Sequence, residues 1–177
     1  MTISLAIDTA TSRTIVGILD GEKVLFEGSH EGATEHGFAI SELVTKALQL
    51  CPQPDQVIVG MGPGPFTGLR VGITFAQTFA LAREIPVIGV CSLDAVKVEK
   101  NEYTVAIDAR RKEIYWATYK DGKRIAGPEV SKPADVGDFI IDQYPDLQKL
   151  VALSASQNIS EPMYLRRPDA VPTAERK

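Results

Sequence analysis

Residues 3–19 read ISLAIDTATSRTIVGIL, and residues 103–119 read YTVAIDARRKEIYWATY. Each stretch contains Ala-Ile-Asp at the end of an apolar run, then a five-residue polar loop and a second run rich in β-branched or aromatic residues. Such runs are typical of buried strands. The offset of one hundred residues between the copies favours a duplicated lobe, and chance similarity between two buried hairpins is the alternative.

The segments around the first copy predict the order βββαβαβ, followed by a short helix. This is the order of a ribonuclease-H-like lobe, an α/β fold in which helices cover the faces of a mixed sheet. The predicted strands are Ile3–Ile7, Thr14–Leu19, Lys23–Glu27, Val57–Gly60 and Pro86–Val90, and the predicted helices are Glu35–Leu50, Thr67–Arg83 and Leu93–Val98.

The sequence therefore predicts two lobes. Residues 1–100 form the first lobe with its dimerisation helices, and residues 101–177 form a second, shortened lobe. In the second lobe the pattern weakens after Lys123, where Pro133–Gln143 predicts a helix and Leu150–Leu153 a strand.

Composition points to a cytoplasmic protein that is no dedicated nucleic-acid binder. The formal net charge is −4 over 177 residues, whereas nucleic-acid binders usually present a basic face. The two cysteines, Cys51 and Cys91, form no C-x-x-C pair, which indicates a reducing compartment. We expect no signal peptide and no membrane contact, since no apolar run reaches the roughly 18 residues needed to span a bilayer.

Asp8, Thr9 and Thr11 are the candidate nucleotide-binding residues. An aspartate at the end of such a strand often helps to place a phosphate-bound metal, and hydroxyls can donate to phosphate. The loop lacks the glycines that let backbone N–H groups approach phosphate, however. The alternative is that Asp8 closes its own loop as an Asx-turn.

Residues 60–70 read GMGPGPFTGLR and join a strand to a helix. A glycine-rich loop at a helix start can hold an anion. This loop is not a P-loop, and its prolines carry no N–H to donate. The sequence favours a rigid elbow with Thr67 as the helix N-cap.

The two long helices carry more apolar residues than one sheet face can cover. The second is apolar all round, and Gly72, Ala76 and Ala80 recur every four residues as a stripe of small side chains. Burial by neighbouring helices of the same chain is the alternative to an interface. The predicted partner interface is His36, Phe38, Leu69, Gly72, Ile73, Ala76, Phe79 and Ala80.

We predict no metal site and no catalytic residue. The only histidines, His30 and His36, are six residues apart and do not share a helical face. The sequence contains no H-E-x-x-H motif, no Cys/His cluster and no G-x-S-x-G elbow.

Taken together, these motifs resemble the TsaB family, the bacterial accessory subunit for threonylcarbamoyladenosine modification of tRNA. The resemblance covers most of the chain, and its Gly-Pro-Gly-x-Phe-Thr-Gly-Leu-Arg segment is highly specific. The segments that carry it are residues 5–11, 62–73, 88–93, 106–110, 113–116 and 162–166.

The resemblance implies a duplicated actin/Hsp70-like fold and a non-catalytic paralogue of the larger subunit TsaD. Two metal-binding histidines of TsaD correspond to Ser92 and Val96, neither of which can replace imidazole. It also implies pairing with TsaD through the helices Glu35–Leu50 and Thr67–Arg83, work with the ATPase TsaE, and contact with tRNA only through the complex. We expect a homodimer when the chain is alone, no cofactor of its own, and ATP or ADP only in the complex.

One departure is a short second lobe, because a strand-and-helix section is missing between Lys149 and Pro162. Two other functions stay open. Asp8, Asp108 and the Gly/Pro loop suit an independent ATP-binding hydrolase or kinase of the actin/Hsp70 type. A metallopeptidase is the third hypothesis.

Overall fold

The computed structural model describes residues 2–166, and the end of the predicted second lobe, residues 167–177, lies outside them. The first sheet has the strand order β3-β2-β1-β4-β5. Strands β1, β2 and β3 form an antiparallel meander, and β4 and β5 continue the sheet parallel to β1. The five strands are β1 (Ile3–Asp8), β2 (Arg13–Asp20), β3 (Lys23–Glu31), β4 (Gln56–Gly60) and β5 (Val87–Val90).

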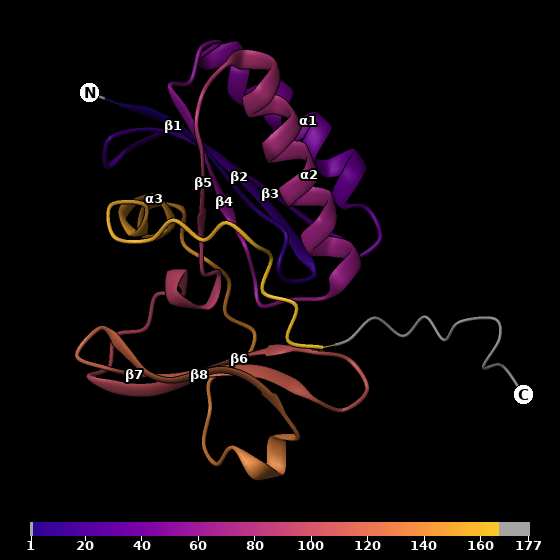
Figure 1. Cartoon of the computed structure of the whole chain (residues 1–177), viewed down its shortest axis with the longest axis vertical. Coiled ribbons are helices and arrows are strands. Elements are labelled where there is room, and N and C mark those ends of the chain that lie inside the picture. The colour runs from indigo at the N-terminus through magenta and orange to yellow at the C-terminus, as the bar shows by residue number, and fades with distance from the viewer. Residues whose placement is uncertain (1, 167–177) are drawn as a thin grey trace, which may run out of the picture.

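Alternation along β1 gives this sheet two apolar faces. Leu5 and Ile7 belong to the core beneath α1 (His36–Leu50) and α2 (Phe66–Arg83). Ala6 belongs to the core on the other face, which α3 (Leu147–Leu153) covers. Figure 1 shows α1 and α2 together on one side of the sheet and α3 on the opposite side.

The second sheet repeats the first hairpin. Strands β6 (Glu102–Asp108), β7 (Ile114–Lys120) and β8 (Lys123–Ser131) form an antiparallel sheet in that order, drawn below the first in Figure 1. The Asp8↔Ile15 pair at the end of the β1–β2 ladder corresponds to Asp108↔Ile114 in the β6–β7 ladder. The fold is therefore the predicted duplicated ribonuclease-H-like, actin-like architecture with a reduced second sheet.

The helix predicted for Pro133–Gln143 is wrong. Only a 3-10 turn, η2 (Pro133–Asp135), forms there. Gly137 and Asp142 then take left-handed backbone conformations, which end any helix. Ile140 instead makes a parallel bridge to Val105 at the edge of the second sheet. The predicted short helix Leu93–Val98 is likewise only the 3-10 turn η1 (Leu93–Ala95).

The strand predicted for Leu150–Leu153 is also wrong, because these residues belong to α3. Asp146 caps this helix by accepting a hydrogen bond from the backbone N–H of Lys149 at 2.9 Å. Leu147 and Leu150, three residues apart, bury one face of α3 on the first sheet. The chain thus returns to the first sheet after residue 101, and the division between the lobes after residue 100 stays a prediction. Within residues 2–166, no helix is long and apolar enough to cross a membrane.

Candidate functional site

Asp8 lies at the centre of the molecule with no exposed surface. Its Oδ1 accepts from the N–H of Ala10 at 2.8 Å, which is the Asx-turn considered above. Its Oδ2 accepts from the Ser92 hydroxyl at 2.6 Å. A side chain at Gly60 would collide with this carboxyl group, so the site leaves no open approach on that side.

Burial raises the pKa of Asp8 to about 6, although the hydrogen bonds from Ser92 and Ala10 act in the opposite direction. A perturbed carboxyl group is often a sign of function. Here the carboxyl group is enclosed by its own hydrogen-bond partners, so its raised pKa results from burial in the core.

The hydroxyl groups of the other two candidate nucleotide-binding residues are also engaged. Thr9 Oγ1 donates to the carbonyl of Gly68 at 2.8 Å, which ties the loop after β1 to the first turn of α2. Thr11 Oγ1 accepts from the N–H of Arg13 at 3.1 Å. Thr9 and Thr11 are both buried, although Thr11 lines a cavity, and nucleotide binding through these groups stays a prediction.

Asp108 repeats the same turn in an open setting. Its Oδ1 accepts from the N–H of Arg110 at 2.9 Å, and its Oδ2 lies 3.5 Å from the Arg110 guanidinium. The two side chains are exposed and line a cavity of about 190 Å³ between the lobes. Thr11, Asp142 and Tyr144 line the same cavity, so it presents groups of both charges.

The predicted interface on α2 needs correction for its small residues. Gly72, Ala76 and Ala80 are buried within this chain, as are Leu69 and Ile73. Ala76 and Ala80 belong to the core over the first sheet, and a side chain at Gly72 would collide with Thr9. The stripe therefore packs on the chain's own sheet, and these five residues cannot contact a partner in the folded state.

His36 is buried as well, with 4% of its surface exposed, and its Nδ1 lies 2.8 Å from the Thr14 hydroxyl. Burial lowers its pKa, and the charge of His30 acts in the same direction. Phe38 is the opposite case, since 67% of it is exposed, as its predicted outward position requires.

Beside its buried stripe, α2 carries three large apolar residues that pack only partly against the core, and the predicted interface included one of them, Phe79. Val71 and Phe75 are half-buried, as is the predicted Phe79. These three residues recur every four positions, so they form a stripe beside the buried one. The rings of Phe75 and Phe79 stack with centroids 6.0 Å apart. We call Phe38, Val71, Phe75 and Phe79 the outer helical patch.

The two positions that the resemblance matches to metal-binding histidines of TsaD have structural roles here. Ser92 donates to Asp8 and accepts from the N–H of Gly62 at 3.2 Å, and Val96 is buried in the core of the second sheet. Among the residues that the structure describes, no three His, Cys, Asp or Glu side chains are grouped as a metal site would require.

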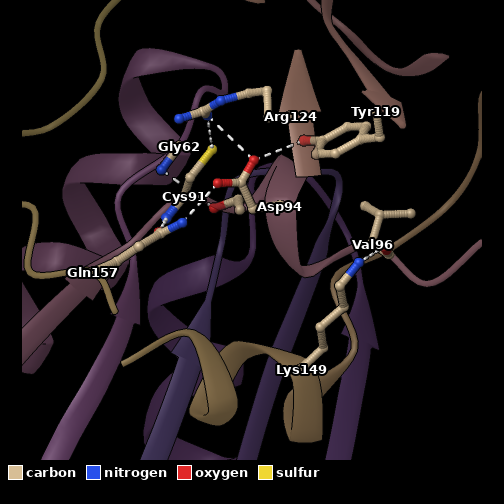
Figure 2. A network of polar contacts seen from close by, with 9 residues as sticks. Gly62, Cys91, Asp94, Val96, Tyr119, Arg124, Lys149 and Gln157 are labelled. Atoms are coloured by element: carbon tan, nitrogen blue, oxygen red, sulfur yellow. Dashed lines mark hydrogen bonds and ion pairs between the residues drawn. The ribbon is translucent and has the colours of Figure 1, made fainter. Parts of the chain in front are cut away.

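Asp94 joins the two lobes through a buried network. Its Oδ1 accepts from the hydroxyl of Tyr119 on β7 at 2.8 Å and lies 3.2 Å from the guanidinium of Arg124 on β8. Its Oδ2 accepts from the amide of Gln157 at 2.7 Å, and Gln157 in turn accepts from the N–H of Cys91. Figure 2 shows these side chains converging on Asp94 from both lobes.

Three comparisons place this chain among known proteins. The family described as TsaD, tRNA N6-adenosine threonylcarbamoyltransferase, matches residues 31–170. An uncharacterised protein of Mycobacterium leprae is 40% identical over 205 residues, covering 97% of this chain and 57% of that protein. The tRNA threonylcarbamoyladenosine biosynthesis protein TsaB of Escherichia coli is 37% identical over 125 residues, covering 66% of this chain and 54% of that protein.

Among solved structures, an uncharacterised Pseudomonas aeruginosa protein with similarity to peptidase YEAZ matches with a TM-score of 0.77 at 23% identity. The match covers 94% of this chain and 100% of that one, and it supports the fold. This chain spans little more than half the length of the two relatives above. The alignment of 205 residues is longer than this chain of 177, so the M. leprae protein has residues without a counterpart here.

Proposed function

This chain belongs to the TsaB family of TsaD-like proteins, and from that premise we propose that it is an accessory subunit in the biosynthesis of threonylcarbamoyladenosine in tRNA. It would do no transfer chemistry itself and would activate TsaD by binding it. Relatives named for this biosynthesis support the role. The observation that supports this mode of action is the outer helical patch, which combines an exposed aromatic residue on α1, Phe38, with three half-buried apolar residues on α2.

Such a patch fits a helical partner. We propose that the apolar residues of both helices contact this partner, because apolar side chains left at the surface can mark an interaction site. Two helices of TsaD laid against α1 and α2 would extend the helical layer outward from the sheet. We propose that a second copy of this chain occupies the same face when TsaD is absent. TsaE joins the complex in this proposal, and tRNA reaches this subunit only through the complex.

Reconstitution tests the role directly. TsaD, TsaE and unmodified tRNA are supplied with threonylcarbamoyl donor, with and without this chain, and modified adenosine is measured. We expect modification to depend on this chain. Equal modification in both reactions would contradict an activating role.

An independent nucleotide-hydrolysing enzyme is the second candidate, because Thr11, Asp108 and Arg110 line a cavity between the lobes. Under the accessory role, tight nucleotide binding is expected in the complex only. Calorimetric titration of the isolated chain with ATP and Mg²⁺ separates the two. Micromolar affinity accompanied by hydrolysis would favour the enzyme, whereas its absence is the result we expect.

A further inference from the structure

The last segment that the structure describes, residues 157–166, connects the two lobes along one side of the molecule. The N–H of Met163 donates to the carbonyl of Met61, at the end of β4, at 2.8 Å. Arg166 then donates to the carbonyl of Ala109 in the second lobe at 2.9 Å. Figure 1 shows this segment in yellow as it runs from α3 down to the second sheet. We call residues 157–166 the connecting segment.

The connecting segment places Tyr164 against the first residue of α2, Phe66. The two ring centroids lie 4.8 Å apart, the rings are tilted by 47°, and 38% of each residue is exposed. Helix α2 begins at Phe66, after Pro65, so the cap expected at Thr67 is wrong. Arg70 is therefore one helical turn after Phe66, and its guanidinium lies 5.2 Å from the Phe66 ring centroid. Two rings and a guanidinium thus meet at the surface.

The loop after β6 carries a cluster of positive charge. Arg110, Arg111 and Lys112 follow one another in this loop, and all three are exposed. All three take left-handed backbone conformations, with φ of 62°, 53° and 63°, which residues other than glycine adopt rarely. The N–H of Ala109 donates to the carbonyl of Glu113 at 2.9 Å and closes the loop in this shape. The tight turn therefore concentrates three cationic side chains at one exposed place.

The connecting segment also brings the basic loop close to the two rings. Glu113 of the loop forms an ion pair with Arg166, and the other acid of the loop, Asp108, lies 3.5 Å from Arg110. Arg166 is only two residues after Tyr164, a span of at most about 7 Å along the chain. The contacts of Arg166 thus fix the aromatic pair beside the loop and at the same time neutralise its nearest acid.

We call Phe66, Arg70, Lys112 and Tyr164 the aromatic–basic surface. None of the four lines the cavity between the lobes, and none belongs to the outer helical patch. Neither Arg70 nor Lys112 pairs with an acidic side chain within residues 2–166. Arg70 directly precedes Val71 in α2, so this surface adjoins the outer helical patch.

Exposed rings beside unpaired cations suit a single strand of RNA. Unpaired bases stack on aromatic rings and on guanidinium planes, whereas lysine and arginine side chains contact the phosphates. Bases within a duplex are stacked on one another and offer no free face to such rings. An acidic protein segment would pair with the cations but would gain less from the two rings. The observations therefore favour single-stranded RNA over a protein ligand.

We propose that the aromatic–basic surface binds a single-stranded stretch of the tRNA substrate within the complex with TsaD. This inference rests on the proposed accessory function and names the surface through which the substrate contacts this subunit. Because the surface lies at the start of α2, which also carries most of the outer helical patch, a strand bound there runs beside TsaD. The net charge of −4 agrees with RNA contact that is local and depends on the complex.

The affinity of the purified complex of this chain and TsaD for labelled, unmodified tRNA tests this surface. Fluorescence anisotropy is measured with Tyr164→Ala, which removes one ring, and with Lys112→Glu, which reverses one charge. We expect each change to weaken tRNA binding at least about fivefold, and Lys112→Glu also to reduce the salt dependence of binding. Both side chains lie at the surface, so both variants should fold and pair with TsaD, which co-purification checks.

Two further variants make this test specific. Tyr164→Phe keeps the ring and should restore the affinity, since stacking does not need the hydroxyl group. Lys123→Glu makes the same charge reversal at the exposed start of β8, outside the aromatic–basic surface. Equal losses of affinity in Lys123→Glu and Lys112→Glu would mean a general charge effect and would overturn the proposal.

Competition identifies the class of ligand. A short single-stranded RNA should displace tRNA from the complex more effectively than a duplex RNA of equal length, and Tyr164→Ala should abolish this difference. Normal tRNA affinity in all variants would overturn the proposal, as would weaker binding of TsaE in place of tRNA, since a protein would then be the ligand. The accessory role is decided separately, by whether modification depends on this chain.

Discussion

Asp8 illustrates how a residue with the marks of function can be structural. It stands where a nucleotide-binding aspartate would stand, and its pKa is raised to about 6. Yet both oxygens accept hydrogen bonds from within the chain, and the backbone at Gly60 closes over them. Sequence alone could not separate the Asx-turn from a metal-placing role, because the tripeptide is the same in both.

Asp8 should make stability fall as the pH rises. Its folded pKa of about 6 lies above its ordinary 3.8, so the folded state binds the proton more tightly than the unfolded state. The resulting stabilisation is full below about pH 4 and is lost as the pH rises through about 6, a change of about 3 kcal/mol.

Urea unfolding of the Asp8→Asn variant and of the unmodified chain, at several pH values between 4 and 7, measures this pH-dependent stabilisation. We expect the difference between their unfolding free energies to shift with pH in favour of the variant. Asp108→Asn removes the exposed counterpart and serves as the control. If the unfolding free energies of Asp8→Asn and the unmodified chain changed with pH in parallel, Asp8 would not be the cause of the pH dependence.

At the scale of the element, helix α2 carries apolar residues on all of its sides. Its composition indicates burial on several sides but does not say which side meets the sheet. The small stripe of Gly72, Ala76 and Ala80 suits close approach to any surface, and here that surface is the chain's own sheet and Thr9. The larger stripe that includes Phe75 and Phe79 stays half-buried, packed against the core but partly exposed.

Ala76→Arg should therefore unfold the first lobe rather than only block a partner. An unpaired charge in this core costs about 3–5 kcal/mol, and the side chain has no room. Thr78→Arg, exposed on the same helix, should change the free energy of unfolding by less than about 0.5 kcal/mol. Chemical denaturation compares the two, and an Ala76→Arg variant as stable as Thr78→Arg would refute the placement of the stripe.

The elements that the sequence predicts correctly are those with a long and regular hydrophobic periodicity. Strands β1 and β2 and helices α1 and α2 agree with prediction within one or two residues. Helix α3 was missed because Leu150–Leu153 is a short apolar run that suits a strand or a buried helix equally. The cap at Asp146 was the available signal. Strand β8 was missed because Gly127 and Pro128 interrupt its pattern, and its pairing with β7 shifts register there.

The outer helical patch could be located only with the structure. Which faces of α1 and α2 are exposed depends on how the two helices pack on the sheet. The resemblance indicates the two helices as the partner interface, and this assignment stays a prediction. The direction in which each side chain of these helices points depends on how the helices pack on the first sheet.

At the scale of the whole molecule, Asp94 holds the lobes together. It is the shared acceptor for Tyr119, Arg124 and Gln157, which come from three segments of the chain. Because Tyr119 and Arg124 belong to the second sheet and Asp94 precedes it in the chain, the orientation of the two lobes should depend on this carboxylate.

Asp94→Asn keeps the shape but removes the charge that Arg124 and Tyr119 contact. We expect a loss of about 2–3 kcal/mol of stability, since hydrogen bonds to a buried charge are among the strongest. Hydrogen exchange should quicken in β6–β8. Glu102→Gln breaks an exposed ion pair with Lys120 and should cost no more than about 1 kcal/mol. Equal hydrogen-exchange rates of β6–β8 in the two variants would rule out this role of Asp94.

Binding of purified TsaD to the Phe38→Glu variant tests the central claim most directly. Phe38 is 67% exposed, so the change leaves the core intact while placing a charge in the outer helical patch. Ile125→Glu, 57% exposed on β8, is the matched control. We predict that Phe38→Glu lowers the affinity for TsaD at least about a hundredfold and that Ile125→Glu leaves it unchanged. Undiminished binding by Phe38→Glu would contradict the proposal that this protein acts through the helices of its first lobe.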